Sequence, residues 1–208
     1  MERSDLFDGW NRRESPKGGR VGVKAWDIIK SEVRDDYKIF RLRVDTAKSP
    51  RTEGVHEFYI LESPDWVNVI PITREGLVVL VRQFRHGTKE VTLEIPGGLV
   101  EPGDSPEDAA RRELLEETGY SAPHFLYLGA VAPNPAFLNN RCHTFLAKDA
   151  TRIQMQNQDE KEDIEVLTCP LEEVKELIRK GQITHSLVIA AFYRLFVEGT
   201  PESLLTEE

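Results

Sequence analysis

The sequence lacks the features that anchor or cross-link a small protein. Among its 208 residues there are only two cysteines, Cys142 and Cys169, and they do not have the spacing of zinc ligands. We therefore predict two reduced thiols, as in cytosolic proteins. The N-terminus contains no apolar signal core, and the longest purely aliphatic run, Leu77–Val81, is far too short to span a bilayer. These absences predict a cytoplasmic protein with no membrane partner.

An excess of positive charge is also missing. The formal net charge at pH 7 is −9, from 27 Lys and Arg against 36 Asp and Glu. Proteins that bind nucleic acids or anionic membranes need a basic surface, so we expect neither partner. A small phosphorylated ligand is still compatible with this charge, because metal ions and a few arginines can neutralise it.

The chain contains many short strand-like segments around a few helices. Apolar residues at helical spacing predict two helices near the C-terminus, Leu171–Lys180 and His185–Val197. This mixture predicts an α+β or mixed α/β fold. The segments predicted as strands are Val23–Val33, Tyr37–Asp45, His56–Leu61, Trp66–Ile72, Leu77–Gln83, Val91–Ile95, Phe125–Val131, Cys142–Ala147 and Ile164–Thr168.

The clearest helix begins after Ser105. This serine can cap the helix, Pro106 suits the first helical position, and Asp108 stands where the acidic residue of a capping box belongs. Gly119 provides a natural end. These signals predict a helix between Ser105 and Gly119.

Three carboxylates on this helix suggest phosphate chemistry. Glu113, Glu116 and Glu117 stand at i, i+3 and i+4, so they share one helix face, where like charges destabilise the helix. Divalent cations between them are the simplest explanation, because Mg²⁺ takes oxygen ligands and binds through carboxylates together with substrate phosphates. The alternative is an acidic face that contacts only solvent.

The segment from Gly98 to Tyr120 resembles the signature sequence of the Nudix hydrolases. It departs from that signature at two positions. Asp104 replaces a Glu that braces the preceding loop against the helix, often through the residue that is Arg112 here, and Tyr120 replaces an aliphatic residue. The residues that match are Gly98, Arg112, Glu113, Leu114, Glu116, Glu117 and Gly119.

The wider chain resembles the ADP-ribose pyrophosphatase branch of this family, or more broadly its nucleoside-diphosphate-sugar hydrolases. Leu80–Arg85 resembles a segment that carries a phosphate-contacting arginine in that branch. Pro135 stands where the branch often has a proline, although Asn134 and Ala136 flank it instead of the common Ser and Gly. Asp159–Ile164 resembles an acidic loop that supplies catalytic carboxylates.

The resemblance implies a metal site. Glu113 and Glu117 would be metal ligands, Glu116 a third ligand or a helper, and the carbonyl of Gly97 a further contact. Mg²⁺ is the implied cofactor, with Mn²⁺ as a substitute.

It also implies a general base, which has to reach the attacking water. Glu160 and Glu162 of the acidic loop are the candidates, and Glu116 is the fallback. The alternative for the loop is an ordinary charged surface segment.

Four further residues are candidates for substrate binding. Arg85 and Arg82 can bind phosphate oxygens through their guanidinium groups, but strand alternation turns them to opposite faces, so we favour Arg85. Glu94 is a candidate for contact with a metal or a ribose, and Pro135 for contact with the substrate. The alternatives are a surface arginine at a strand end and a partly paired strand glutamate.

Taken together, the resemblance implies an α+β Nudix fold in which helices sandwich a mixed sheet. Residues 1–55 would form an added N-terminal β-element, which enzymes of this branch often exchange between the subunits of a homodimer, and residues 56–208 the Nudix hydrolase domain. The implied reaction is Mg²⁺-dependent hydrolysis of a nucleotide sugar, with ADP-ribose leading and GDP-mannose or a similar compound next. The products would be a nucleoside monophosphate and a sugar phosphate.

The sequence leaves two other functions open. One is a Nudix hydrolase of nucleoside triphosphates, dinucleoside polyphosphates or capped RNA, of which RNA is disfavoured by the acidic balance. The other is a binding module that senses a nucleotide sugar without cleaving it. Such a module would be expected to lose the signature carboxylates, whereas this chain retains three.

Overall fold

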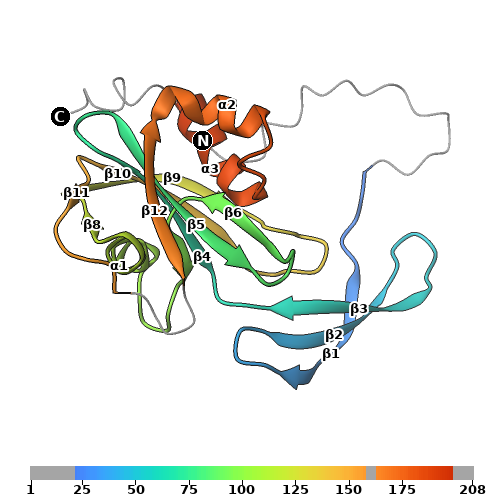
Figure 1. Ribbon diagram of the computed structural model, residues 1–208. Helices are drawn as coiled ribbons and strands as arrows, with labels where there is room; N and C mark the ends of the chain where they lie inside the picture. Colours follow the sequence, from blue (N-terminus) through green and yellow to red (C-terminus); the bar gives the residue numbers. More distant parts are fainter. Residues whose placement is uncertain (1–21, 158–162, 199–208) are drawn as a thin grey trace, which may run out of the picture.

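A seven-stranded mixed sheet forms the body of the protein, whose computed structural model describes residues 22–157 and 163–198 (Figure 1). Its strands are β4 (Trp66–Ile72), β5 (Leu77–Arg85), β6 (Glu90–Glu94), β7 (Gly97–Leu99), β9 (His124–Val131), β10 (Cys142–Lys148) and β12 (Ile164–Pro170). The strand order is β12-β5-β4-β10-β9, with β6 paired to β5 and β7 paired to β4. The β4–β10 pairing is parallel and the others in this sheet are antiparallel.

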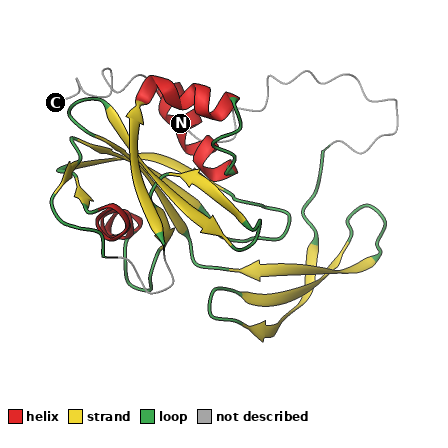
Figure 2. Ribbon diagram, viewed as in Figure 1, coloured by secondary structure: helices red, strands yellow, loops and turns green. Residues whose placement is uncertain are grey.

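Helices cover both faces of this sheet (Figure 2). α1 (Pro106–Thr118) packs on one face, and α2 (Val174–Arg179) and α3 (Ser186–Glu198) pack on the other, after a 3₁₀ turn η2 (Leu171–Glu173). Strand alternation in β4 explains the two layers, because Val67 and Val69 face α1 while Ile70 and Ile72 face α3. The predicted α+β class and the sandwich of a mixed sheet between helices are confirmed.

The first helix begins and ends as its sequence predicts. The amide of Asp108 donates to Ser105 Oγ over 3.1 Å, and the Asp108 carboxylate accepts from the Ser105 amide, which completes the capping box. Gly119 adopts a left-handed φ of 74°, and its amide donates to the Leu115 carbonyl over 2.8 Å. A short two-stranded sheet of β8 (Tyr120–Ser121) and β11 (Thr151–Arg152) follows the helix.

A separate three-stranded antiparallel sheet precedes the body. It consists of β1 (Asp27–Asp36), β2 (Arg41–Lys48) and β3 (Val55–Glu62), in that order (Figure 1). The strand predicted to begin at Tyr37 is wrong at its start, because 37–40 form the turn of the β1–β2 hairpin, where the Tyr37 amide donates to the Phe40 carbonyl. The prediction failed because the apolar alternation continues through that turn. β3 pairs with β2 along its whole length, so it belongs to the same sheet as the strands before residue 55.

The loop between β9 and β10 joins the two sheets. The Leu61 amide donates to the Phe137 carbonyl and the Trp66 amide to the Arg141 carbonyl, each over 2.8 Å. Asn140 Nδ2 donates to the Pro64 carbonyl over 3.0 Å. These bonds tie the end of β3 and the segment between β3 and β4 to the β9–β10 loop.

Two further observations concern the helices and the cysteines. None of the helices in the described ranges is both long and apolar enough to cross a membrane. Cys142 and Cys169 are free thiols, and burial raises the pKa of Cys142 to about 12. A thiol with so high a pKa is a poor nucleophile, so Cys142 acts as a small apolar residue.

Candidate active site

The turn between β6 and α1 brings main chain directly against helix α1. β7 pairs with β4 and contacts the helix, and its first two residues are glycines. A Cβ atom added to Gly97 would lie 2.2 Å from the Val67 carbonyl oxygen, and one added to Gly98 would lie 2.4 Å from the Glu113 carboxylate. Only glycine allows so close an approach at these two positions.

The carboxylates of α1 meet this turn. Glu117 is only 4% exposed, and its Oε2 accepts a hydrogen bond of 3.0 Å from the Gly97 amide. Glu113 lies against Gly98 and accepts from Arg112 Nη1 over 2.8 Å. Glu116 is more exposed and shares the same Arg112 nitrogen at 3.4 Å. The structure therefore brings Gly97, Glu113 and Glu117 together, with Glu116 at the rim.

The chemistry of these groups fits a hard divalent cation. The donors are three carboxylates and main-chain carbonyls, which are the oxygen ligands that Mg²⁺ takes. Within the part of the chain that the structure describes, however, no three acidic, His or Cys side chains are gathered closely enough to hold a metal ion. Arg112 and the Gly97 amide neutralise the carboxylates instead. A cation would therefore compete with Arg112 for Glu113 and Glu116.

The contacts of Arg112 show what is lost when Asp104 replaces the first Glu of the signature. The Nε atom of Arg112 lies 3.6 Å from Asp104 Oδ2, which is within the range of an ion pair but too long for a hydrogen bond. That Nε atom is buried and has no hydrogen-bond partner. Nη2 of the same guanidinium donates to the Leu99 carbonyl over 3.0 Å. The missing methylene of Asp104 thus leaves one donor of the brace unsatisfied.

Replacing Asp104 by Glu is expected to stabilise the protein by about 1 kcal/mol, because the longer side chain can accept the bond from Arg112 Nε. For a chain of this size that corresponds to a rise in Tm of roughly 2–4 °C, measurable by differential scanning calorimetry. Asp104→Gln, which has the same length without the charge, is the control and should gain less. An Asp104→Glu variant with unchanged or lower Tm would contradict this account of the brace.

A cleft of about 640 Å³ borders the two glycines. Its walls come from β4, from the β5–β6 hairpin and from the residues around the start of α3. Residues that line it include Trp66, Asn68, Arg85, Thr88, Glu90, Thr92, Glu94, Gly97, Gly98, Thr184, His185 and Ser186. The cleft and the α1 carboxylates therefore meet at Gly97 and Gly98.

Arg85 and Glu94 form an ion pair in the wall of this cleft. Arg85 Nε and Nη2 donate to the two oxygens of Glu94 over 2.8 and 2.7 Å. Thr92 Oγ1 donates to the same carboxylate over 2.6 Å. Burial raises the pKa of Glu94, but the bonds from Arg85 and Thr92, with a smaller contribution from His185, outweigh it, so the pKa lies below its usual value. Glu94 is therefore ionised and fixes the guanidinium of Arg85 at the cleft.

Other residues predicted for the site lie elsewhere. Arg82 is exposed and pairs with Glu165 of β12 over 2.8 Å, and Pro135 is exposed in the β9–β10 loop. Neither is among the described residues that line the cleft. Glu160 and Glu162 lie outside the described residues.

Asn68 and His185 also line the cleft, although neither belongs to the signature and neither was predicted for the site.

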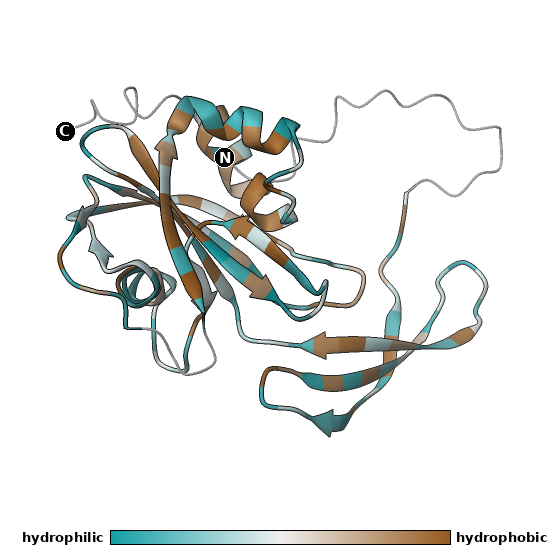
Figure 3. Ribbon diagram, viewed as in Figure 1, coloured by the Kyte–Doolittle hydropathy of each residue, from teal (hydrophilic) through white to brown (hydrophobic). Residues whose placement is uncertain are grey.

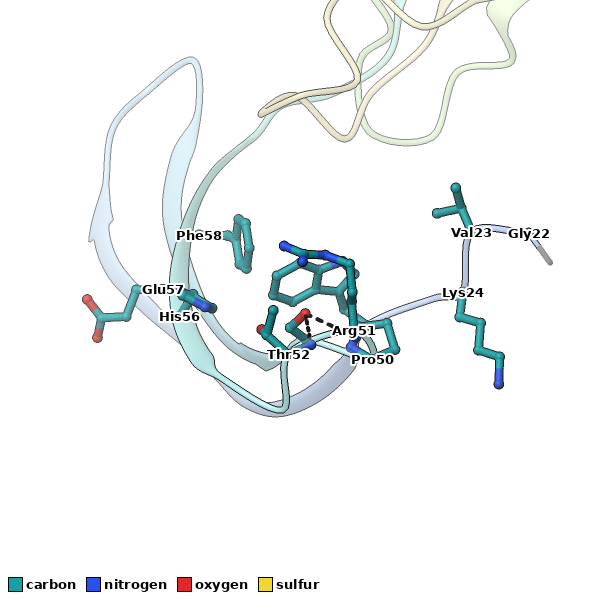
Figure 4. A pocket seen from close by; sticks show the side chains of 11 residues that line it. Gly22, Val23, Lys24, Pro50, Arg51, Thr52, His56, Glu57 and Phe58 are labelled. Atoms are coloured by element: carbon teal, nitrogen blue, oxygen red, sulfur yellow. Dashed lines mark hydrogen bonds between the residues drawn. The ribbon is translucent and has the colours of Figure 1, made fainter. Parts of the chain in front are cut away.

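A second pocket of about 880 Å³, which the sequence did not predict, lies in the N-terminal sheet (Figure 4). The rings of Trp26 and Phe58 pack edge to face with their centroids 5.1 Å apart. The side chain of Arg51 also lines this pocket and lies beside Phe58 (Figure 4). Trp26 stands in a weak strand pattern just before β1, so only the pairing of β1 with β2 and of β2 with β3 reveals the pocket.

The fold and the site together define the class of protein. Residues 63–192 match the NUDIX domain family, and the chain belongs to this family. The resemblance seen in the Gly98–Tyr120 signature is thereby confirmed.

Two relatives and one solved structure are similar to this chain over most of its length. The chain is 33% identical to the ADP-ribose pyrophosphatase of Bacillus subtilis (strain 168) over 147 residues, which are 70% of this chain and 79% of that protein. It is 30% identical to the GDP-mannose pyrophosphatase of Enterobacter sp. (strain 638) over 185 residues, which are 83% of this chain and 96% of that protein. The crystal structure of an ADP compounds hydrolase matches with a TM-score of 0.75 at 21% identity, covering 85% of this chain and 95% of the other. This match confirms the predicted fold.

Proposed function

We propose that this Nudix protein is a pyrophosphohydrolase that cleaves the diphosphate of nucleoside-diphosphate sugars. The observation that carries the proposal is the contact of Glu113 and Glu117 with Gly98 and Gly97 at the edge of a cleft. It puts acidic groups against the two glycines that line this cleft, while the α1 glutamates themselves are not among the described residues that line it. The names of the relatives, which include ADP-ribose and GDP-mannose pyrophosphatases, support ADP-ribose as the leading substrate and GDP-mannose or a similar compound next.

Mg²⁺ is the proposed cofactor, and Mn²⁺ its substitute. Glu113, Glu117, Glu116 and the carbonyl of Gly97 are the groups that would hold it. When bound, such a cation neutralises charge on the diphosphate and lowers the pKa of a bound water. Arg112 pairs with Glu113 and Glu116, so a cation that binds these carboxylates would take the place of the guanidinium.

The protein's own groups have two tasks in the hydrolysis. Arg85, held by Glu94, is the proposed contact for a phosphate oxygen, because a guanidinium binds such oxygens well. A general base takes a proton from the attacking water as its oxygen bonds to one phosphorus. The bridging P–O bond then breaks and its electron pair leaves with the departing phosphate. Glu116 is the proposed base among the described residues, and Glu160 and Glu162 remain the candidates of the acidic loop.

A second copy of this chain is the proposed partner. The N-terminal sheet exposes many large apolar side chains, and hydrophobic residues recur along its strands (Figure 3). Monomers rarely expose large apolar patches, so a partner that covers this sheet is expected. Exchange of residues 1–55 together with β3 between subunits would bring the pocket of Trp26, Arg51 and Phe58 to the cleft of the other subunit, where its rings could stack on a base. The exposed residues include Ile28, Ile29, Val33, Val55, Phe58 and Tyr59. The free thiols support the proposed cytoplasmic location.

A substrate panel with Mg²⁺ tests the proposal. Nucleotide sugars, nucleoside triphosphates, dinucleoside polyphosphates and capped RNA are incubated with the protein, and products are identified by chromatography. We expect nucleoside monophosphate and sugar phosphate from nucleotide sugars, with the highest kcat/KM for ADP-ribose. Tight binding of nucleotide sugars without turnover would instead establish a sensor, and preferred cleavage of triphosphates would replace the proposed substrate class.

A further inference from the structure

Two side chains in the wall of the cleft each contain a buried polar atom without a hydrogen-bond partner. These atoms are Asn68 Nδ2 and His185 Nδ1. Buried polar groups are normally hydrogen-bonded, so each exception needs an explanation. The other two such atoms among the described residues are Asn140 Oδ1 and Arg112 Nε, and neither of these residues lines the cleft. The coincidence of two orphaned atoms in one cleft points to a polar ligand that satisfies both.

The two residues come from separate elements that border the site. Asn68 lies on β4 and pairs with Gly97, the residue whose amide holds Glu117. His185 directly precedes α3 and lies near enough to Glu94 to act on its charge. A ligand that reaches both therefore extends from the glycine turn toward Glu94 and the start of α3.

The chemistry of the wall favours a neutral ligand with several hydroxyl groups. Arg85 is the only Lys or Arg among the described residues that line the cleft, and it is already the proposed contact for the diphosphate. Glu90 adds a negative charge that would repel a further phosphate. A hydroxyl both donates and accepts, so it can bond the Asn68 amide and either tautomer of His185. Thr88, Thr184 and Ser186 add further hydroxyls to the same wall.

We infer that Asn68 and His185 bind the sugar hydroxyls of the substrate and thereby determine which sugar the enzyme accepts. This inference rests on the proposed function, since it assigns one half of the proposed substrate to one part of the cleft. The two residues are thus specificity determinants that contact the sugar, which does not take part in the bond that breaks.

A comparison of two substrates tests the inference. One is ADP-ribose, and the other is the methyl ester of ADP at its terminal phosphate, which keeps the nucleoside and the diphosphate but has no sugar beyond them. His185→Ala is expected to lower kcat/KM for ADP-ribose about three- to tenfold, mainly through KM, because one hydrogen bond is lost. The same variant should leave kcat/KM for the methyl ester unchanged. Asn68→Ala should give the same pattern.

Two further variants serve as controls. His185→Asn places an amide near the position of the imidazole Nδ1 and should restore part of the lost KM. Asn140→Ala removes an asparagine with an orphaned atom outside the cleft and should affect both substrates equally. Equal losses on both substrates in His185→Ala, or no loss on either, would mean that the orphaned atoms hold only a water, and the inference would fall. A wild-type protein that cleaves neither ADP-ribose nor any other nucleotide sugar of the substrate panel would instead refute the proposed function.

Discussion

Replacing Glu117 by Gln is expected to lower kcat for the nucleotide sugar by about 10²–10³-fold, because it removes a charge that acts on the reacting diphosphate through the proposed cation. The fold should persist. Gln has nearly the same shape, and its Oε1 atom can still accept the 3.0 Å bond from the Gly97 amide. The substitution also removes one of three like charges on a helix face, so the Tm of the metal-free protein should be equal or higher. Steady-state rates and calorimetry measure the two quantities.

The control is Glu107→Gln on the same helix. Glu107 is exposed and pairs with Arg111 at i+4, and it is not among the described residues that line the cleft. It should leave the rate unchanged and lower the stability only slightly, as expected for a surface ion pair. Binding of Mg²⁺ and Mn²⁺, measured by titration calorimetry, should weaken in Glu117→Gln and not in Glu107→Gln. A wild-type rate in Glu117→Gln would show that Glu117 is not a metal ligand.

Features that depend on local sequence could be predicted. The capping box of Ser105 and Asp108 and the left-handed Gly119 are determined by residues within one turn of each other, so their order in the sequence suffices. The same holds for the spacing of the α1 glutamates. The alternation of β5 correctly separated Arg82 from Arg85, which pair with Glu165 of β12 and Glu94 of β6 respectively.

Features that depend on pairing between distant segments could not be predicted. His185 and Asn68 are more than a hundred positions apart, and only the packing of α3 on β4 places both in one cleft. The turn at 37–40 is hidden because its apolar residues continue the alternation of the strands on either side. The unsatisfied Nε of Arg112 likewise depends on its distance of 3.6 Å from Asp104 Oδ2, because Asp104 lies in the loop before α1 and its position cannot be read from helix spacing.

Replacing Gly98 by Ala is expected to lower kcat by about 10²-fold with little loss of stability, because misplacing a group by about 1 Å can cost that factor. The new Cβ would overlap the Glu113 carboxylate at 2.4 Å, and that carboxylate is the far end of a side chain that can rotate away together with its partner Arg112. Gly97→Ala makes the matched contrast, since its Cβ would meet the Val67 main-chain oxygen at 2.2 Å. There the strands themselves must move, so the free energy of unfolding should fall by roughly 1–3 kcal/mol or more.

Gly87→Ala controls for the loss of glycine itself, because its Cβ would meet no atom within 4 Å. Its stability should equal that of the wild type or exceed it slightly. The double variant Gly98→Ala/Glu113→Ala should be as stable as Glu113→Ala alone, since the overlap is gone, yet remain inactive. If Gly98→Ala instead unfolds at low temperature, Glu113 is held too rigidly to yield. If it keeps the wild-type rate, the position of the Glu113 carboxylate does not limit catalysis.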